Sequence, residues 1–553
     1  MTLRNTPTWL RRRHRAYSLR FASAIIMRAL TLLLCLHATA LAASPAKPRL
    51  PAGLVIASIK IESHEVFDTS APPENKKLYK LANDLHIRTR DAVIERELLF
   101  EVGDTYDQAL IEETERALRG LSFIRRAKIE ATVNDLGSVD LIVRTYDSWS
   151  LEVIAGFKRS GGVDGFNGGL AEHNILGEGK GAGVEYSRNG PSASESLSYQ
   201  DPQFLHHKHL QFAAAAASNP GSKNFALTLN RPFASSISPY SYGGLLTYNV
   251  SDFAAPTGLY SKSIIEAGPN FGVAVATSTE RTRRVTLGFL AHHADYMLKQ
   301  GQPSLVPPPP REQWGFFQLG GDWEELDFMT VRRINKFTHD EDINMGFGII
   351  PAVAWAPEVR ALGITGAQVL PSISAHKGFT WGDQLLLLSS GYSSKYVDGG
   401  NSNRLASFNA VYYLRGFKYQ TLAFHCGLDL AWHLDPISQL SLGEVNGLRG
   451  YGLSEFSGDR RFLFNIEDRI FVWDELFRLF DVGAVAFFDS GYAGQSSTGI
   501  RPHDLKSSVG LGFRGAPSRS SGNNPLRIDM AYALSDNKTS SRWSLSILAG
   551  QAF

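Results

Sequence analysis

Over residues 149–553 the chain alternates between apolar and polar side chains in one short segment after another. In residues 525–534 the apolar set is Leu526, Ile528, Met530, Tyr532 and Leu534, and the intervening set is Arg527, Asp529, Ala531 and Ala533. Because successive side chains of a strand point to opposite faces, each such segment has one apolar and one polar face. Charge on one face and large apolar groups on the other predict a closed membrane barrel, with lipid outside and water inside.

The last segment repeats this pattern. Its outward set is Trp543, Leu545, Ile547, Ala549 and Phe553, interrupted by Gln551, against Ser544, Ser546 and Gly550. A terminal strand that carries an aromatic residue at its end is typical of membrane barrels. We therefore expect Trp543 and Phe553 to form the carboxy-terminal barrel signal and to face lipid.

Composition supports one large β unit over residues 148–553. The 553 residues include 51 Gly and 11% aromatic residues, and few amphipathic helical patterns follow Asp147. The net charge of +2 excludes a strong field for polyanions, so we expect no nucleic-acid partner. Counting alternating segments predicts a mainly β, antiparallel barrel of between sixteen and twenty strands, with an even number.

The first residues look like an export signal. A basic stretch around Arg11 and Arg15 precedes an apolar run and small residues before position 43, which predicts a signal peptide over residues 1–42, with a possible true start at Met27. Residues 43–52 form a Pro-rich linker. Removal of the signal leaves Cys426 as the only cysteine, so the exported chain has no intramolecular disulfide.

Residues 53–147 differ from all that follows. A strand at 54–62, helices at 91–100 and 107–118, and strands at 123–133 and 139–146 give the order β-α-α-β-β. On the second helix, residues at helical spacing should pack on the sheet, whereas its charged residues should lie largely in solvent. The first set is Leu110, Ile111, Thr114 and Leu118, and the second is Glu112, Glu113, Glu115 and Arg116. An open edge of this sheet could accept an added strand.

This region resembles a polypeptide-transport-associated (POTRA) domain, in a single copy. The resemblance rests on residues 90–94, on Glu97 to Phe100, on Val102-Gly103-Asp104, and on 117–121 with Phe123 and Ile124. It implies a periplasmic domain that receives a client or an envelope partner.

The glycine-rich stretch 177–183 superficially resembles a nucleotide-binding fingerprint. That motif needs a following helix, whose free amides meet the phosphates. Residues 184–188 alternate instead, so we expect a tight hairpin. No nucleotide, metal or other cofactor is implied.

A tetrad, Leu448, Arg449, Gly450 and Tyr451, lies in the long loop of residues 435–460. If the loop folds into the barrel, two sets of strand residues could receive it: Asn465, Glu467 and Arg469, and Phe487, Asp489 and Gly491. A buried guanidinium needs an acceptor, because leaving it unpaired costs several kcal/mol. We therefore expect Asp489 or Glu467 to pair with Arg449.

These motifs, with residues 172–179, resemble the BamA/TamA superfamily of outer-membrane assembly barrels, also known as bacterial surface antigens. In that family a loop tetrad of this type enters the barrel and its arginine meets a Phe-x-Asp-x-Gly strand. The resemblance implies sixteen strands, a Gram-negative outer-membrane location and a role in membrane protein assembly or protein translocation. Three features depart from it: there is one POTRA domain, the pattern count of strands runs as high as twenty, and Asp468 has lipid-facing parity. Either the carboxylate of Asp468 lies near the membrane interface, or the register of its strand slips locally.

Closure of the barrel must join the first and last strands. A short last strand with Gly550 and several serines predicts a weak seam, whose unpaired backbone groups could template an incoming strand. The expected function is insertion, assembly or translocation of unfolded outer-membrane polypeptides at that seam, in contact with outer-membrane lipids. The alternative is a passive channel, lipid-handling barrel or surface antigen of the same fold. An enzyme is not expected, because the sequence has neither a Gly-x-Ser-x-Gly elbow nor a His-Glu-x-x-His pair.

Overall fold

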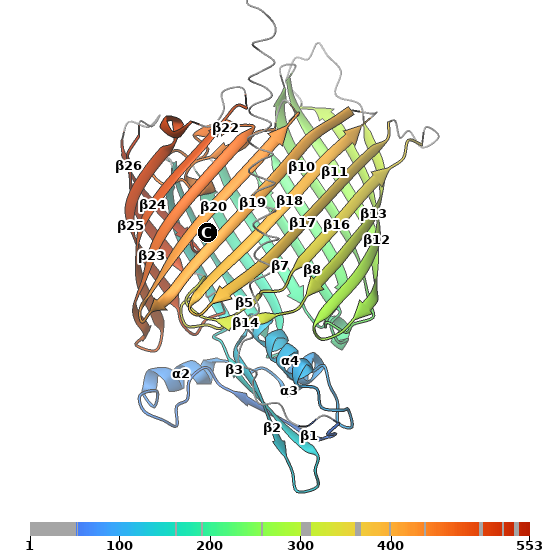
Figure 1. Ribbon diagram of the computed structural model, residues 1–553, viewed down its shortest axis with the longest axis vertical. Coiled ribbons are helices and arrows are strands. Elements are labelled where there is room, and N and C mark those ends of the chain that lie inside the picture. Colours follow the sequence, from blue (N-terminus) through green and yellow to red (C-terminus); the bar gives the residue numbers. More distant parts are fainter. Residues whose placement is uncertain are drawn as a thin grey trace, which may run out of the picture.

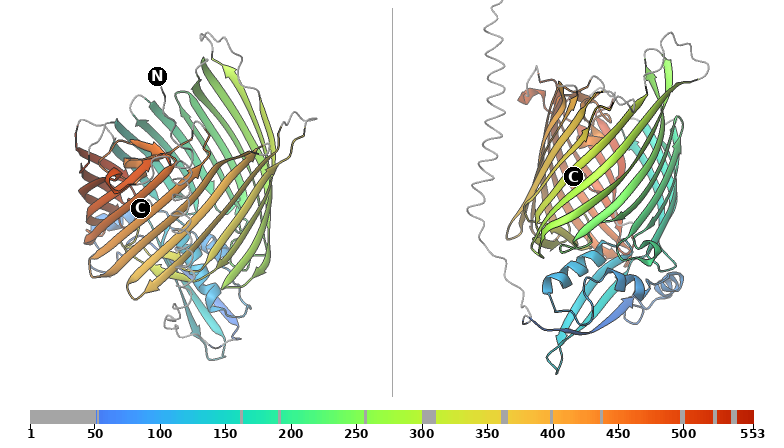
Figure 2. Two further views of the ribbon diagram at one scale, coloured as in Figure 1. Left: turned by 45° about the horizontal axis from the view of Figure 1, so that its top comes forward. Right: turned by 90° about the vertical axis from the view of Figure 1, so that its right-hand side faces the viewer.

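The computed structural model describes residue 51 and residues 53–160, 163–189, 192–255, 258–299, 311–359, 366–397, 400–435, 438–496, 501–521, 525–535 and 541–553. The expected signal peptide and nearly all of the linker lie outside these residues. The described chain forms a large barrel and a small N-terminal domain that lies against one end of it (Figures 1 and 2). We call that end of the barrel the near end and the opposite one the far end.

The N-terminal domain contains the five expected elements and one more. They are β1 (Ile56–His64), α2 (Lys77–Leu85), α3 (Asp91–Glu97), α4 (Gln108–Gly120), β2 (Ile124–Val133) and β3 (Val139–Asp147). The sheet order is β1-β3-β2, with β1 parallel and β2 antiparallel to β3. Helix α2, between β1 and α3, was not expected from the sequence. Strands β1 and β2 are the outer strands of this sheet.

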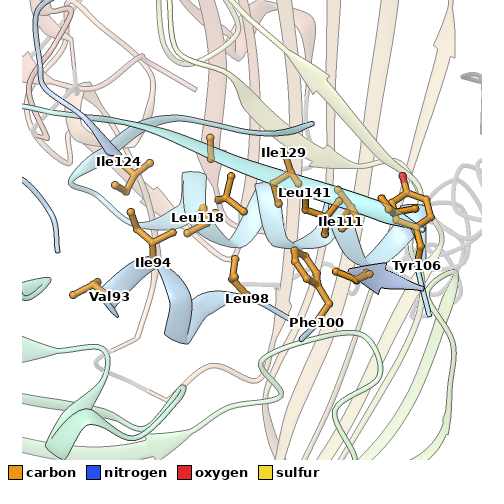
Figure 3. Packing of buried hydrophobic residues seen from close by; sticks show 14 of the residues in the cluster. Val93, Ile94, Leu98, Phe100, Tyr106, Ile111, Leu118, Ile124, Ile129 and Leu141 are labelled. Atoms are coloured by element: carbon orange, nitrogen blue, oxygen red, sulfur yellow. The ribbon is translucent and has the colours of Figure 1, made fainter. Parts of the chain in front are cut away.

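The core of the domain lies between the helices and the sheet (Figure 3). Ile94, Leu118 and Leu141 are fully buried there. Helix α4 begins as predicted, because the Asp107 side chain caps it by accepting from the amide of Ala109 at 2.8 Å. The expectation that Glu115 faces solvent is wrong. Its carboxylate is buried and accepts from the amide of Ile129 of β2 at 2.7 Å, which fixes α4 on the sheet.

The barrel is closed and has 20 antiparallel strands. They are β4 (Leu151–Ser160), β5 (Val163–Ile175), β6 (Lys180–Asn189), β7 (Ser192–Asp201), β8 (Gln211–Asn219), β9 (Ser222–Arg231), β10 (Tyr240–Ala255), β11 (Gly258–Thr277), β12 (Arg281–Leu298), β13 (Glu312–Glu325), β16 (Gly348–Ala356), β17 (Gln368–Trp381), β18 (Gln384–Val397), β19 (Gly400–Phe417), β20 (Gln420–Trp432), β23 (Arg460–Leu476), β24 (Phe480–Gly494), β25 (Lys506–Pro517), β26 (Leu526–Ala533) and β27 (Trp543–Ala549). The count is the upper limit of the sequence pattern. The sixteen strands implied by the family resemblance are wrong, because every alternating segment long enough to cross forms a strand of the wall.

The two faces of the wall follow the predicted parity. On β26, Leu526 and Met530 are exposed on the outside, whereas Arg527 and Asp529 between them are buried on the inside. An outer surface of this kind, on a closed barrel without strand edges, is suited to lipid. Among the described helices, none is long and apolar enough to cross a membrane.

Asp468 of β23 keeps its outward parity without a register slip. Its two carboxylate oxygens accept from the side-chain amide of Gln420, at 2.7 and 2.6 Å. Gln420 is the first residue of β20, at the near end of the wall. The carboxylate is therefore close to the barrel edge, as one of the two expected alternatives requires.

A further hairpin at the near end is not one of the strands of the wall. Residues 326–347, which we call the floor segment, connect β13 to β16 and contain β14 (Phe328–Val331) paired with β15 (Glu341–Asn344) (Figure 1). Its Val331, Ile334 and Met345 pack on inward-facing Leu385 and Tyr413 of the wall. The floor segment therefore occupies the base of the barrel interior.

Polar contacts fix the N-terminal domain to the near-end turns. The expected tight hairpin after β5 is present. Its Gly177 carbonyl accepts from the amide of Arg90 at 3.0 Å, and a Cβ on Gly177 would lie 2.4 Å from the Arg88 carbonyl oxygen. The carboxylate of Asp342 in the floor segment accepts a forked pair of bonds from Arg119 of α4, at 3.0 and 2.9 Å. Both the wall and the floor segment thus hold the domain.

Candidate functional site

The long loop between β20 and β23 folds into the barrel. It contains β21 (Leu440–Leu442) paired with β22 (Phe456–Gly458), and a short 3₁₀ turn, η3 (Glu444–Asn446). The tetrad follows η3. Leu448, Arg449 and Tyr451 are at most 1% exposed, so the loop tip is completely enclosed.

Two glycines let the loop pass close to the wall. Gly447 and Gly450 have φ angles of 97° and 88°, which L side chains rarely adopt. A Cβ on Gly447 would lie 2.6 Å from a methyl carbon of Leu463. The Gly450 position of the tetrad is therefore constrained by backbone conformation, and its neighbour Gly447 by conformation and space together.

Arg449 lies among three carboxylates from three different strands. Its Nε and Nη2 each donate at 2.7 Å to a different oxygen of Asp489 of β24. Its Nη1 donates to Glu467 of β23 at 2.7 Å and to Asp529 of β26 at 3.2 Å. The guanidinium also lies 3.5 Å from the ring centre of Phe487, in cation–π geometry. Both expected partners therefore bind Arg449 at once.

Sequence reasoning missed the third carboxylate, Asp529, as a partner, although parity placed it inside. Arg514 of β25 donates to the Oδ1 of Asp529 at 2.5 Å, and the Nε of Arg527 lies 3.3 Å from its Oδ2. The cluster then holds four cations and three anions: Arg449, Arg469, Arg514 and Arg527 against Glu467, Asp489 and Asp529. Four positive minus three negative charges leave +1. Near neutrality is what makes so many buried charges tolerable.

Arg469 joins this cluster to the floor segment. It donates from Nε to Glu467 at 2.8 Å and from Nη1 to the carbonyl of Ile334 at 2.7 Å. Its Nη2 donates to the backbone oxygen of Phe553 at 3.0 Å. One carboxylate, Glu467, thus accepts from the loop arginine on one side and from the floor-bound arginine on the other.

The expectation that Phe553 faces lipid is wrong. Strand β27 ends at Ala549, and Gly550 follows with a φ of 86°, which turns the chain away from the wall. The Phe553 ring stacks on His425 at 5.2 Å and lies 5.0 Å from the Arg469 guanidinium. Trp543, by contrast, is 58% exposed on the outer surface. Only the first of the two expected signal residues therefore points to lipid.

The remaining tetrad and strand residues support the loop. Tyr451 donates from its hydroxyl to the carbonyl of Ser507 at 2.8 Å, and Leu448 packs in a small cluster with Leu442 and Leu463. Gly491 of β24 leaves room for the loop, because a Cβ there would lie 2.8 Å from a methyl carbon of Leu442. Among the residues that the structure describes, no group of three or more His, Cys, Asp or Glu is placed to hold a metal ion.

The seam between β4 and β27 borders a hollow of about 880 Å³. Val153 and Ile154 of β4 line it from one side, and Ile547 and Leu548 of β27 from the other. In each pair the two residues are consecutive, so they belong to opposite faces of the wall. The hollow therefore adjoins both the outer and the inner side of the seam.

Comparison with known proteins gives one sequence relative. Over 137 residues the chain is 26% identical to the outer membrane protein assembly factor BamA of Neisseria meningitidis serogroup B, and this alignment includes 23% of the chain. It spans 17% of the length of that protein. No family model matches the chain. The match confirms the resemblance to the BamA/TamA superfamily that the motifs suggested.

Solved structures with similar barrels are more distant in sequence. CdiB from Escherichia coli has a TM-score of 0.46 at 11% identity, covering 93% of this chain and 92% of that one. CdiB from Acinetobacter baumannii has a TM-score of 0.40 at 11% identity, covering 90% and 74%. BamA from Haemophilus ducreyi lacking POTRA domains 1–3 has a TM-score of 0.34 at 13% identity, covering 90% and 83%.

Proposed function

We propose that this chain is an outer-membrane barrel that inserts or translocates outer-membrane polypeptides at the seam between β4 and β27, without catalysis or a cofactor. The single observation that carries the proposal is the hollow at this seam, bordered by both faces of the wall. The name of the sequence relative, an outer membrane protein assembly factor, points the same way. The clients would be unfolded strands, which need backbone partners in a membrane.

The last strand of the wall favours opening at this place. Strand β27 has seven residues, fewer than any other strand of the described wall, and pairs with β26 over Trp543–Ala549. A short strand contributes few backbone hydrogen bonds to the seam, so separating it costs less than separating two long strands. The edge of β4 that this exposes can pair with an incoming strand.

Backbone hydrogen bonds hold the near end of β4 in place, which favours opening of the seam from the far end. The amide of Trp149 donates to the carbonyl of Arg519 at 2.7 Å, and the amide of Ser521 donates back to Trp149 at 3.0 Å. The Arg519 side chain is itself paired with Glu74 of the N-terminal domain at 2.6 Å. We expect the seam to open as a wedge whose closed end lies at these bonds.

Two segments that occupy part of the interior argue against a wide passive pore. The loop carrying Arg449 enters from the far end and donates to Glu467, whereas the floor segment lies at the near end and accepts from Arg469. Glu467 and Arg469 are bonded to each other. A passive channel would gain nothing from two such segments. Ion conductance in planar bilayers should therefore be small, and a large steady conductance would favour the channel alternative.

We infer further that residues 53–147 are a POTRA domain in the periplasm, with the near end facing that compartment. The outer strands β1 and β2 of its sheet offer free backbone groups to a client strand. The domain is fixed to the barrel base through Arg119 and Asp342, close to where a client would reach the wall.

A disulfide across the seam tests the proposal. With Cys426→Ser as background, cysteines at Val153 or Ala155 of β4 are combined with cysteines at Leu545 or Ile547 of β27. The oxidised pairs should abolish insertion of an unfolded barrel client into liposomes that contain the protein, and reduction should restore it. The matched control is Val153→Cys with Leu170→Cys, which locks β4 to β5, a pair already in register. Undiminished insertion by a locked seam would contradict the proposal.

The physiological test compares the outer-membrane proteome with and without the gene. Selective loss of particular barrel proteins, restored by the reduced but not by the oxidised seam variant, is the expected result. An unchanged proteome would exclude a role in assembly.

A further inference from the structure

Helix α2 is bonded to the near-end turn between β23 and β24. The hydroxyl of Tyr79 donates to the carbonyl of Phe477 at 2.8 Å, and the Tyr79 ring packs on Phe67 at 4.9 Å. The side chain of Asn83 bonds both the amide and the carbonyl of Phe67, at 3.2 and 2.8 Å. One face of α2 therefore packs against the rest of the protein.

A second face is apolar and exposed. Leu78, Leu81 and Leu85 are 60%, 55% and 67% exposed, and Ile87 just after the helix is 50% exposed. With about 100° per residue, the three leucines lie within roughly 60° of one another, so they form one stripe. Three large apolar side chains on so short a helix are costly in water, and such a stripe marks an interaction surface.

The charges around the stripe are mainly positive. Lys76, Lys77 and Lys80 are exposed, and Asp84 is the one acidic residue among positions 76–85. Three positive minus one negative charge leave +2. Lys77 borders the stripe, and Lys76 and Lys80 add positive charge at the start of the helix and farther round it. Such a helix fits the surface of an anionic bilayer, where the leucines enter the headgroup region and the lysines meet phosphates.

The position of α2 agrees with this partner. The helix lies just beyond the near-end rim of the barrel and under its edge, in each of the views in which the wall is upright (Figures 1 and 2). The turn that it contacts and the strand ends beside it expose large aromatic residues: Phe477 of the turn is 73%, Trp473 of β23 54% and Phe480 of β24 51% exposed. Aromatic residues at a barrel edge mark the membrane interface. Helix α2 therefore lies beside the part of the barrel edge where these aromatic side chains are exposed.

We propose that α2 is an interfacial anchor, which inserts Leu78, Leu81 and Leu85 into the anionic phospholipid leaflet at the near end of the barrel. The anchor ties the N-terminal domain to the bilayer as well as to the barrel. It requires a barrel that spans a membrane but does not depend on client insertion at the seam, so each idea can fail without the other.

A fluorescent probe at single positions tests the anchor in the full chain. On the Cys426→Ser background, an environment-sensitive dye is attached at Leu81→Cys, at Lys80→Cys or at Leu136→Cys. Leu136 is the matched control, because it is 90% exposed in the turn between β2 and β3, on the side of the domain away from the barrel. The protein is reconstituted in phosphatidylethanolamine vesicles containing phosphatidylglycerol, and spin-labelled lipid serves as the quencher.

At position 81 we expect a blue-shifted emission and strong loss of fluorescence to the lipid quencher. At 136 the dye should be quenched by aqueous iodide instead, and at 80 it should be intermediate. Replacing Lys76, Lys77 and Lys80 with Glu should reduce the lipid quenching at 81 in these vesicles, with less effect in phosphatidylcholine. If position 81 behaves as 136 does, the stripe belongs to a protein partner and the proposal is wrong. Heat-modifiable migration on gels checks that each barrel is folded.

Discussion

The guanidinium of Arg449 and the carboxylate of Asp489 form a forked pair in which two nitrogens each lie 2.7 Å from a separate oxygen, fully buried inside the barrel. Arg449→Ala leaves three carboxylates without this cation, so we expect a loss of about 3–5 kcal/mol in the free energy of unfolding. Denaturant titration followed by tryptophan fluorescence measures it.

The control for that substitution is Arg461→Ala. Arg461 pairs with Asp429 at 2.7 Å, but both side chains are partly exposed, so its loss should cost about 0–1 kcal/mol. Arg449→Lys should recover little, because an ammonium cannot reproduce the fork. Equal costs for Arg449→Ala and Arg461→Ala would contradict the central role assigned to the Arg449 cluster.

Phe553→Ala should loosen the barrel base. The ring is half-buried against His425 and Arg469, so we expect a loss of about 2 kcal/mol, less than the ~3–5 kcal/mol of a fully buried phenylalanine. Trp543→Ala, on the outer surface, should leave hydrogen exchange of the floor segment unchanged. Exchange of residues 326–347 that rises only in the Phe553 variant is the expected result, and the reverse pattern would place Phe553 with the lipid-facing residues.

Acid should release the floor segment through His339. Burial, and then the nearby charges of Lys336, Arg125 and Arg126 against that of Asp340, lower the pKa of His339 from 6.5 to about 3. The released imidazole takes up a proton below pH 6.5, whereas the docked one does so only near pH 3. Docking therefore weakens as pH falls from 6.5 towards 3, by up to about 1.4 kcal/mol per pH unit.

Hydrogen exchange of residues 326–347 checks this at each pH, with His339→Gln as the reference. The variant cannot titrate there, so the ratio of exchange between the two proteins should rise as the pH falls. A constant ratio would show that His339 does not govern docking.

Breaking the pair of Arg119 and Asp342 should free the N-terminal domain from the floor segment. The two side chains are 11% and 15% exposed, and a forked charged hydrogen bond in such surroundings contributes about 1–3 kcal/mol. Arg119→Asp should increase hydrogen exchange at both α4 and β15. The exchanged pair, Arg119→Asp with Asp342→Arg, should restore protection, and failure to do so would mean that the two residues are not coupled.

Much of the barrel could be predicted because alternation is a local signal. Alternation correctly predicted that Arg527 and Asp529 face the interior. It also predicted that Glu467 and Asp489 face the interior in which the tetrad lies. Alternation does not say whether a strand belongs to the wall, so it could not separate β14 and β15 from the strands around them.

Other features could not be predicted from the sequence, because they depend on backbone conformation or on tertiary contacts. The inward turn of Phe553 depends on the left-handed backbone of Gly550, and a glycine in sequence does not reveal its φ. Helix α2 is a short segment fixed by the contact of Tyr79 with a turn some four hundred residues later. The role of Asp529 depends on where β26 lies relative to the loop, which is a property of barrel closure.

Residues 435–460 and 326–347 approach from opposite ends of the barrel and meet at Glu467 and Arg469. The bonds from Arg449 to Glu467, between Glu467 and Arg469, and from Arg469 to Ile334 form a continuous path from the loop to the floor segment, whose Asp342 accepts from Arg119 of the N-terminal domain. The loop at one end of the barrel and the domain at the other are thus joined by one short chain of bonds that runs through the interior of the protein.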